Sequence, residues 1–473
     1  MNIVGRISEA DKLKQCAESP RPEFVVVYGR RRVGKTYLVK EYFNGRFSFY
    51  ATGVLRGKTK DQLRAFNAAL MQYGCGERSD PKDWFEAFGR LRSILSSDKV
   101  LRDPGSGKRI VFLDEVPWMD TARSDFRVAL DYFWNSFASS VQDLMLIVCG
   151  SATSWIINNI LSDKGGFYNR VTRQIYLAPF SLAECEELLK ANGITANRQQ
   201  IVELYMVFGG IPYYLNLLDK RMSLFQNIDS MLFEPHGELY NEYDHLFESL
   251  FRNHNNHIRV IEALSKRNYG MLRTELVECS GVSNGEGLTK TLSELEQCGF
   301  IRKYRNYSKR EQSFYYQIID PFILFSLKTK RDKAIDRWST FITTPPYYAW
   351  RGNAFEIVCL NHVTQIKGAL GISGISSAEY SWRSSHSDPQ VQVDMIIDRK
   401  DDVINVCEMK FSNEEFVINA DYKKELNHKL DAFRIETGTK KALFLTMVTL
   451  NGLKPNEYSV MIQNVIDGDR LFM

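Results

Sequence analysis

A glycine-bounded turn near the start of the chain constrains the fold more than any other feature. The apolar run 24–28 predicts a buried strand, and a helix-forming stretch begins near residue 35. The segment between them reads Gly29-Arg30-Arg31-Arg32-Val33-Gly34-Lys35-Thr36. It fits the pattern G-x-x-x-x-G-K-[ST], and the strand before it and the helix after it are the context of a phosphate-binding loop. The glycines let backbone N–H groups face phosphates, and the helix start adds partial positive charge.

This loop predicts a binding site for ATP and Mg²⁺. We expect Lys35 to contact the β- and γ-phosphates and the Thr36 hydroxyl to bind Mg²⁺. The three arginines of the loop either strengthen the positive field around the phosphates or form a solvated face: Arg30, Arg31 and Arg32.

Two acids follow a second apolar run, 110–113. We expect Asp114, at the strand tip, to hold Mg²⁺ directly or through water. Glu115 would polarise the attacking water, because phosphoryl transfer depends on positioning and charge neutralisation. Alone, the pair would fit a surface turn equally well, and the loop upstream favours the catalytic interpretation.

Short apolar runs alternate with helical patterns through the first half of the chain, at 24–28, 47–51, 110–113, 144–149 and 174–177. Strands that are apolar on both faces and separated by helices predict an α/β fold with a parallel sheet covered on both sides. Helical patterns dominate from 181 to 243, and the segment 328–346 is charged, then Thr- and Pro-rich, which predicts a linker.

Four motifs together resemble the archaeal-type ATPases of the STAND/AAA+ group: the loop 29–36, the acids 114–115, Gly150-Ser151 and Gly209-Gly210-Ile211-Pro212. The resemblance implies that segment 5–9 lies beside the adenine and that Ser151 is a sensor of the γ-phosphate. It also implies that Pro212 contacts the nucleotide from a helical lid. The bland alternative for the two glycines is a helix C-cap before a proline, and both can hold together.

The same resemblance makes Arg170 the candidate arginine finger or sensor, with Arg173 as the alternative. The family often carries Gly-Arg where this chain has Asn169-Arg170. A finger that acts across subunits would require a homo-oligomer, which the sequence leaves open.

The region 255–320 has the pattern of a winged helix: three helical stretches followed by a strand pair. The strand pair is basic and interleaved with tyrosine, which favours contacts with DNA phosphates. Its cations are Arg302, Lys303, Arg305, Lys309 and Arg310. The alternative is a module that packs against the ATPase or binds protein.

A second group of acids lies near the end of the chain. The runs 390–398 and 403–410 predict a hairpin in which Asp394 lies opposite Glu408, with Lys410 on the same face. Glu356, in a helical stretch, adds a third acid. Asp394 and Glu408 could hold Mg²⁺ and Lys410 could orient a water molecule or steady phosphorane charge.

This constellation resembles the PD-(D/E)xK restriction-endonuclease-like fold, although no proline precedes Asp394. The whole order of modules is similar to ATPases that end in the DUF234 domain. The resemblance implies catalytic roles for Glu356, Asp394, Glu408 and Lys410. The alternative is a salt-bridged sheet face on an inactive nuclease fold.

We therefore expect a P-loop ATPase core at 1–180, a helical lid at 181–250, a winged helix at 251–325 and a nuclease-like α/β domain at 345–473. The predicted function is ATP binding and hydrolysis coupled to DNA binding and Mg²⁺-dependent DNA cleavage. The alternative is a nucleotide-controlled switch or scaffold; a toxin–antitoxin or peptide-recognition role is a weaker third.

Composition agrees with an ordinary protein of the cytoplasm. There are 61 basic and 57 acidic residues, a net charge of +4, which excludes a strongly basic coat or an acidic tail. The sequence has no stretch of about 18 consecutive apolar residues, so we expect no membrane span, and no signal sequence is evident. The 8 cysteines contain no C-x-x-C pair, so we expect reduced thiols. His254 and His257 lack further ligands for zinc.

Overall fold

The computed structural model describes residues 3–162, 167, 169–251, 253–307, 314–331, 335–384, 386–387 and 389–473. Lys309 and Arg310 of the expected basic hairpin lie outside these residues. The chain divides into two compact units, Met1–Pro179 and Phe180–Met473. The finer division into four domains stays a prediction.

The first unit is built on five parallel strands: β1 (Glu23–Tyr28), β2 (Phe49–Thr52), β3 (Arg109–Asp114), β4 (Leu144–Gly150) and β5 (Arg173–Tyr176). Their order across the sheet is β2-β3-β4-β1-β5. Every residue of β4 is buried, because the strand is apolar on both faces. The parallel sheet predicted from the alternating pattern is confirmed.

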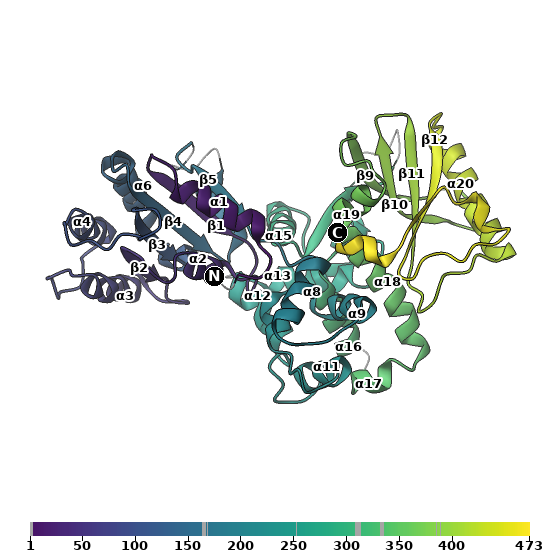
Figure 1. Cartoon of the computed structure of the whole chain (residues 1–473), viewed down its shortest axis with the longest axis horizontal. Coiled ribbons are helices and arrows are strands. Elements are labelled where there is room, and N and C mark those ends of the chain that lie inside the picture. The colour runs from purple at the N-terminus through teal and green to yellow at the C-terminus, as the bar shows by residue number, and fades with distance from the viewer. Residues whose placement is uncertain are drawn as a thin grey trace. The chain divides into compact units, whose positions relative to one another are not determined.

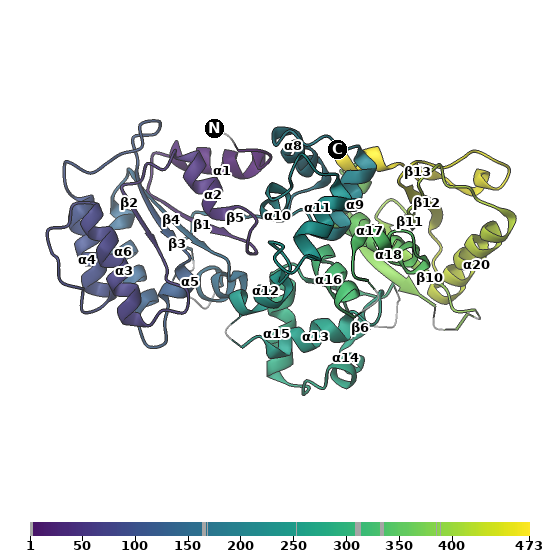
Figure 2. The same ribbon diagram turned by 90° about the horizontal axis from the view of Figure 1, so that it is seen from below.

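Helices cover both faces of this sheet (Figure 2). One side carries α3 (Thr59–Gln72), α4 (Trp84–Leu95) and α6 (Phe126–Ser136), which share a core with β1, β3 and β4. The other side carries α1 (Ile7–Ala17) and α2 (Lys35–Tyr42). The short helices α5 (Val116–Met119) and α7 (Thr153–Ile156) follow β3 and β4.

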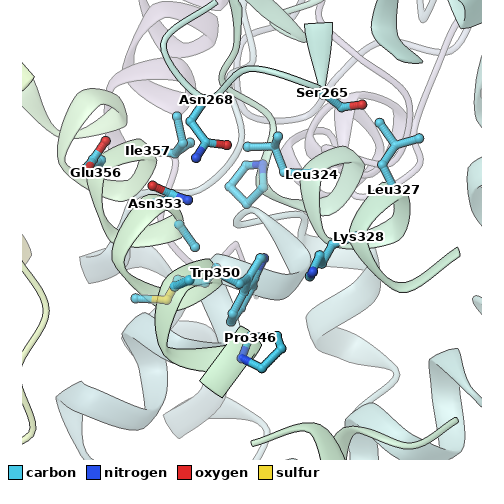
Figure 3. A pocket seen from close by; sticks show the side chains of 14 residues that line it. Ser265, Asn268, Leu324, Leu327, Lys328, Pro346, Trp350, Asn353, Glu356 and Ile357 are labelled. Carbon is cyan, nitrogen blue, oxygen red and sulfur yellow. The ribbon is translucent and has the colours of Figure 1, made fainter. Parts of the chain in front are cut away.

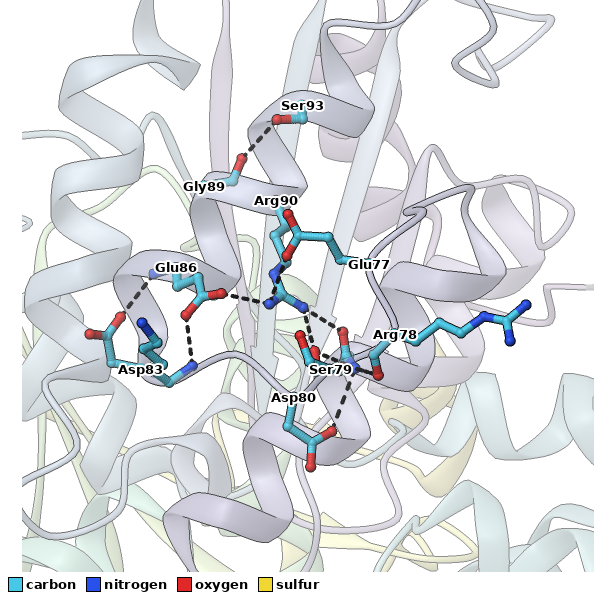
Figure 4. Close-up of polar contacts among 11 residues, drawn as sticks. Glu77, Arg78, Ser79, Asp80, Asp83, Glu86, Gly89, Arg90 and Ser93 are labelled. Atoms are coloured by element: carbon cyan, nitrogen blue, oxygen red, sulfur yellow. Dashed lines mark hydrogen bonds and ion pairs between the residues drawn. The ribbon is translucent and has the colours of Figure 1, made fainter.

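A buried arginine fastens the connection between α3 and α4 (Figure 4). Arg90 donates to the Asn67 side chain (3.1 Å) and to the Ser79 carbonyl (2.6 Å). It also forms ion pairs with Glu77 (2.8 Å) and Glu86 (2.5 Å). Arg90 is 7% exposed, and these contacts hold the segment 77–80 against the helices.

The second unit begins with helices α8 (Leu182–Ala191), α9 (Arg198–Phe208), α10 (Pro212–Asn216), α11 (Leu224–Leu232) and α12 (Glu242–Leu250). Next come α13 (Asn255–Leu264), β6 (Met271–Leu272), α14 (Arg273–Ser280), α15 (Glu286–Gln297), β7 (Ile301–Arg305) and β8 (Phe314–Ile318). The strands form an antiparallel sheet in the order β6-β8-β7. The three helices and the β7–β8 pair lie where the sequence predicts them, and the short β6 is additional.

The expectation of a linker over 328–346 is wrong for the part that the structure describes. Three helices cross this region: α16 (Pro321–Arg331), α17 (Trp338–Phe341) and α18 (Pro345–Asn361). Trp338 is fully buried, and its ring lies 5.4 Å from those of Phe325 and Trp350. Burial of this large ring outweighs the loop-like composition around it.

The carboxyl-terminal sheet is mixed: β9 (Ser377–Arg383), β10 (Gln392–Arg399), β11 (Val403–Lys410), β12 (Ala442–Thr449) and β13 (Asn464–Ile466), in the order β13-β12-β11-β10-β9. The pairs β9–β10 and β10–β11 are antiparallel, and the others are parallel. α18 and α20 (Ala420–Thr437) lie on opposite sides of this sheet (Figure 1), and α19 (Val363–Ala369) follows α18.

The chain after β7 is joined to β9 at the edge of this sheet. The Tyr307 N–H donates to the Ser381 carbonyl (3.0 Å), and the Arg383 N–H donates to Asn306 Oδ1 (3.0 Å). Arg302, within β7, donates to Ser381 Oγ (2.8 Å). The β7 strand and the edge strand β9 are therefore held together by both backbone and side-chain bonds. None of the helices that the structure describes is long and apolar enough to cross a membrane.

Candidate functional site

The glycine-bounded loop connects β1 to α2, as the sequence predicts. Gly29 has φ +148°, and a Cβ at this position would lie 2.3 Å from the carbonyl oxygen of Leu177, just after β5, so the loop passes the backbone there too closely for any side chain. Gly34, at φ +93°, caps the start of α2, which begins at Lys35. The first N–H groups of α2 therefore face the loop.

Lys35 folds back across this loop. Its Nζ donates to the Arg30 carbonyl (2.7 Å), and Lys35 is 4% exposed. Arg30 is 2% exposed, so it does not belong to a solvated face, whereas Arg31 and Arg32 are half-buried. Arg6, at the start of α1, donates to the Val33 carbonyl (3.1 Å) and supports the loop from behind.

The end of β3 meets the start of α2. Thr36 Oγ1 donates to Asp114 Oδ2 (2.8 Å), and the other Asp114 oxygen accepts from the Glu115 N–H (3.0 Å). Burial, and then the Glu115 carboxylate, raise the pKa of Asp114. The hydroxyl and the carboxylate oxygen are hard ligands of the kind that Mg²⁺ prefers, so these two residues fit the ion.

Glu115 turns toward the end of β4. Its Oε2 accepts from the Ser151 N–H (3.1 Å) and its Oε1 accepts from Ser151 Oγ (2.5 Å). Glu115 has φ +49°, and the neighbouring Gly53 leaves no room for a Cβ, which would lie 2.5 Å from the Glu115 carbonyl. The structure thus brings Lys35, Thr36, Asp114, Glu115 and Ser151 to the carboxyl ends of the strands, where ligands of open α/β sheets bind.

Arg170 and Arg173 are not brought to this edge. β5 begins at Arg173, which is paired with Val25 early in β1, so both arginines lie at the amino ends of the strands. Arg170 forms an ion pair with Asp131 of α6. A finger role for Arg170 stays a prediction.

Pro212 belongs to the second unit, and its contact with nucleotide stays a prediction. α9 ends at Phe208, and Gly209 has φ +67°, as expected of a helix C-cap. A Cβ on Gly210 would lie 2.2 Å from the Phe180 carbonyl oxygen. Pro212 is then the first residue of α10.

The carboxylate cluster, which we define as Glu356, Asp394, Glu408 and Lys410, lies in the second unit. The register of β10 with β11 pairs Met395 with Cys407, and the next positions outward are Asp394 and Glu408. The Met409 N–H donates to Asp394 Oδ2 (2.8 Å). Burial, and then Asp394, raise the pKa of Glu356 and of Glu408. The acids therefore share one electrostatic environment.

Two residues of α20 complete the surroundings of Glu408, and sequence reasoning missed both. Lys429 Nζ lies 2.8 Å from Glu408 Oε2, and the Tyr422 hydroxyl donates to the same oxygen (3.4 Å). Lys410 Nζ lies farther away, at 3.9 Å. Glu408 is fully buried, and among the residues that the structure describes its Oε1 has no hydrogen-bond partner. The spacing of seven between Tyr422 and Lys429 places both on one helix face, which is the only signal the sequence offers.

Within the described residues, no group of three or more His, Cys, Asp or Glu side chains is placed to hold a metal ion. The expected third acid, Glu356, does not complete such a set. The orphaned, buried Glu408 Oε1 does fit a cation, since a buried carboxylate oxygen requires a partner. Asp394 and Glu408 are therefore the residues that would hold Mg²⁺.

Glu356 also lines a cavity of about 540 Å³, across from Lys328 (Figure 3). Trp350 and Leu324 supply apolar walls, and Asn353 supplies an amide. The cavity therefore adjoins the carboxylate cluster through Glu356.

The basic hairpin is only partly available to a ligand. Arg302 donates to Gln317 (2.7 Å) and to Ser381, so its guanidinium is used inside the protein. Lys303 and Arg305 are exposed and lie over the Phe314 ring. Arg302 is therefore not available to contact phosphates, whereas Lys303 and Arg305 remain accessible.

Comparison with known proteins places the family signal in the first part of the chain. Residues 3–218 match the model of a family described as an ATPase domain predominantly from Archaea. An uncharacterised protein of Methanocaldococcus jannaschii is 25% identical over 329 residues, which cover 68% of this chain and 67% of that protein.

Two solved structures are similar at lower identity. A Walker-type ATPase of Pyrococcus abyssi is 17% identical with a TM-score of 0.48, covering 69% of this chain and 96% of its own. The ORC2 protein of Aeropyrum pernix, in ADPNP–ADP complexes, is 13% identical with a TM-score of 0.45, covering 70% of this chain and 95% of its own.

Proposed function

Since residues 3–218 carry an ATPase domain of archaeal type, we propose that the loop 29–36 binds ATP with Mg²⁺ and that Glu115 directs its hydrolysis. The observation that carries the proposal is the Thr36–Asp114 hydrogen bond of 2.8 Å, which joins the loop to the acids at the end of β3. The bonds from Ser151 to Glu115 extend this connection to the end of β4.

Each residue has one task in this proposal. Lys35 leaves the Arg30 carbonyl and neutralises phosphate oxygens. Thr36 and Asp114 would hold Mg²⁺, which supplies charge neutralisation to the phosphates when it is bound. Glu115 orients the attacking water, and Ser151 fixes the direction of its carboxylate.

The first experiment separates binding from turnover. Lys35→Ala should abolish ATP binding, because the loop loses its cation. Glu115→Gln, which keeps the shape of the side chain, should retain binding and lose hydrolysis. Unchanged ATP binding in Lys35→Ala would contradict the proposal for the loop.

We further propose that nucleotide state controls DNA binding and Mg²⁺-dependent DNA cleavage in the second unit. The elements α13 to β8 would act as a winged helix, with Lys303 and Arg305 as its exposed cations. Asp394 and Glu408 would hold Mg²⁺, Lys410 would contact the scissile phosphate, and Glu356 would support the site. The buried, unpartnered Glu408 Oε1 supports this assignment.

A second candidate is a nucleotide-controlled switch or scaffold whose carboxylate cluster is only structural. The Lys429–Glu408 ion pair favours it, because the pair satisfies one buried oxygen without any metal. Pro212 and Arg170 would then transmit nucleotide state, the latter across subunits of a homo-oligomer.

Supercoiled DNA incubated with Mg²⁺ and ATP distinguishes the two candidates. Wild-type protein should nick or linearise it, and both Glu408→Gln and Lys410→Ala should not. Cleavage that persists in both variants would exclude the carboxylate cluster as its source. Intact ATP turnover with no cleavage by the wild type would favour the switch.

A further inference from the structure

We propose that Lys429 is an internal counter-ion of the carboxylate cluster: its ammonium occupies the cation position at Glu408, and a divalent metal ion binds only after Lys429 has left. The inference rests on the proposed metal site at Asp394 and Glu408, and it concerns how that site is regulated.

Distance and burial separate Lys429 from the lysine of the sequence motif. Lys429 Nζ lies 2.8 Å from Glu408 Oε2, whereas Lys410 Nζ lies at 3.9 Å. The side chain of Lys429 is 11% exposed and that of Lys410 is 33% exposed. Lys429 is therefore the cation that neutralises Glu408, and Lys410 is the one that a substrate could reach.

Each of the two acids has one carboxylate oxygen that is bound within the protein. One Asp394 oxygen is bound by the Met409 N–H, and one Glu408 oxygen is bound by Lys429. Glu408 Oε1 remains buried, and no atom of the described part of the chain forms a hydrogen bond with it. A divalent ion at that oxygen would lie next to the Lys429 ammonium, and two cations in a poorly solvated site repel each other strongly. Metal and ammonium therefore exclude each other at Glu408.

A second carboxylate is in place to receive the displaced ammonium. Glu425 lies one helical turn before Lys429 on α20, and its Oε1 is 3.3 Å from Lys429 Nζ. The Glu425 side chain is 51% exposed. Lys429 thus contacts both carboxylates, and a rotation of its side chain that breaks only the Glu408 contact would leave the ammonium paired with Glu425.

The inference can be tested by titrating the nucleotide-free, full-length protein with Mn²⁺. Electron paramagnetic resonance measures the free Mn²⁺ at each step. Lys429→Met should tighten Mn²⁺ binding by roughly tenfold or more, because the competing charge is removed. Lys410→Met, which removes an equal charge farther away, should have a smaller effect. All variants share the same ATP-binding loop, so any Mn²⁺ bound there cancels in the comparison.

The inference would be overturned if the folded Lys429→Met variant bound Mn²⁺ no more tightly than the wild type. Adding Glu408→Gln to Lys429→Met should abolish the gain, and a gain that persists would show that the ion binds elsewhere. DNA cleavage is a separate readout: tightened Mn²⁺ binding without cleavage supports the counter-ion and contradicts only the proposed nuclease.

A surface substitution keeps the test valid if Lys429→Met does not fold. Glu425→Gln removes the second, exposed carboxylate beside Lys429. Lys429 should then stay paired with Glu408, and the affinity for Mn²⁺ should fall. Unchanged affinity in Glu425→Gln would contradict the exchange between the two carboxylates.

Discussion

His362 should make the second unit sensitive to mild acid. The residue follows α18 and is 1% exposed. Its Nε2 accepts from the Leu182 N–H (3.0 Å) and its Nδ1–H donates to the Val358 carbonyl (2.7 Å), a tautomer assigned from these bonds. The imidazole thus joins the start of α8 to the end of α18 only while it is neutral.

The size of the effect follows from the pKa. Burial lowers the pKa of His362 from 6.5 to about 4, so the folded state resists protonation and the unfolded state does not. The unfolded chain binds more protons below pH 6.5, and stability must fall as the pH falls from 6.5 toward 4. Between pH 7 and pH 5 the loss is about 2 kcal/mol.

Urea unfolding followed at pH 7, 6 and 5 would measure this loss. His362→Gln can replace both hydrogen bonds and stays neutral, so its unfolding free energy should depend less on pH by about 2 kcal/mol over this range. The exposed His236→Gln is the matched control and should behave as the wild type. Other titrating groups are common to all three proteins and cancel. Parallel pH profiles for His362→Gln and the wild type would refute the reasoning.

Three further substitutions test the loop, the acids and the corrected linker. Gly29→Ala places a methyl group 2.3 Å from a backbone oxygen and should weaken ATP binding by roughly tenfold or more, measured with a fluorescent nucleotide; Gly76→Ala, with no atom near its Cβ, should not. Ser151→Ala leaves the backbone bond to Glu115 but removes the hydroxyl bond, so ATP turnover should fall roughly tenfold while binding is kept; equal loss of both would contradict a positioning role. Trp338→Ala should lower the unfolding free energy of the second unit by about 3–5 kcal/mol in a denaturant titration. A change below about 1 kcal/mol would support the interpretation of this segment as a linker.

The sequence predicted those parts of the molecule that depend on local order. Asp394 was expected opposite Glu408 because a short turn between two alternating strands determines the register, and the register is as expected. The parallel strands were expected because each is a short run that is apolar on both faces. The P-loop was expected from one motif and its flanks.

The parts that depend on distant packing were not predictable in this way. Lys429 reaches Glu408 from a helix that begins ten residues after β11, and no spacing rule connects an α20 lysine to a strand carboxylate. Trp338 lies in a Thr- and Pro-rich stretch, so composition suggested a linker, although one large buried ring decides otherwise. The sequence shows Arg302 only as one cation of a basic strand pair, and its bonds to Gln317 and Ser381 depend on tertiary packing.

The bonds between the chain after β7 and the edge strand β9 have a consequence for geometry. Arg302, Asn306 and Tyr307 fasten this hairpin to Ser381 and Arg383, so the exposed Lys303 and Arg305 keep a constant spacing from Asp394, one strand farther in. Under the proposed function, a DNA duplex bound at those cations would reach the acids at a constant number of base pairs. Strand breaks would then fall at a fixed distance from the bound phosphates.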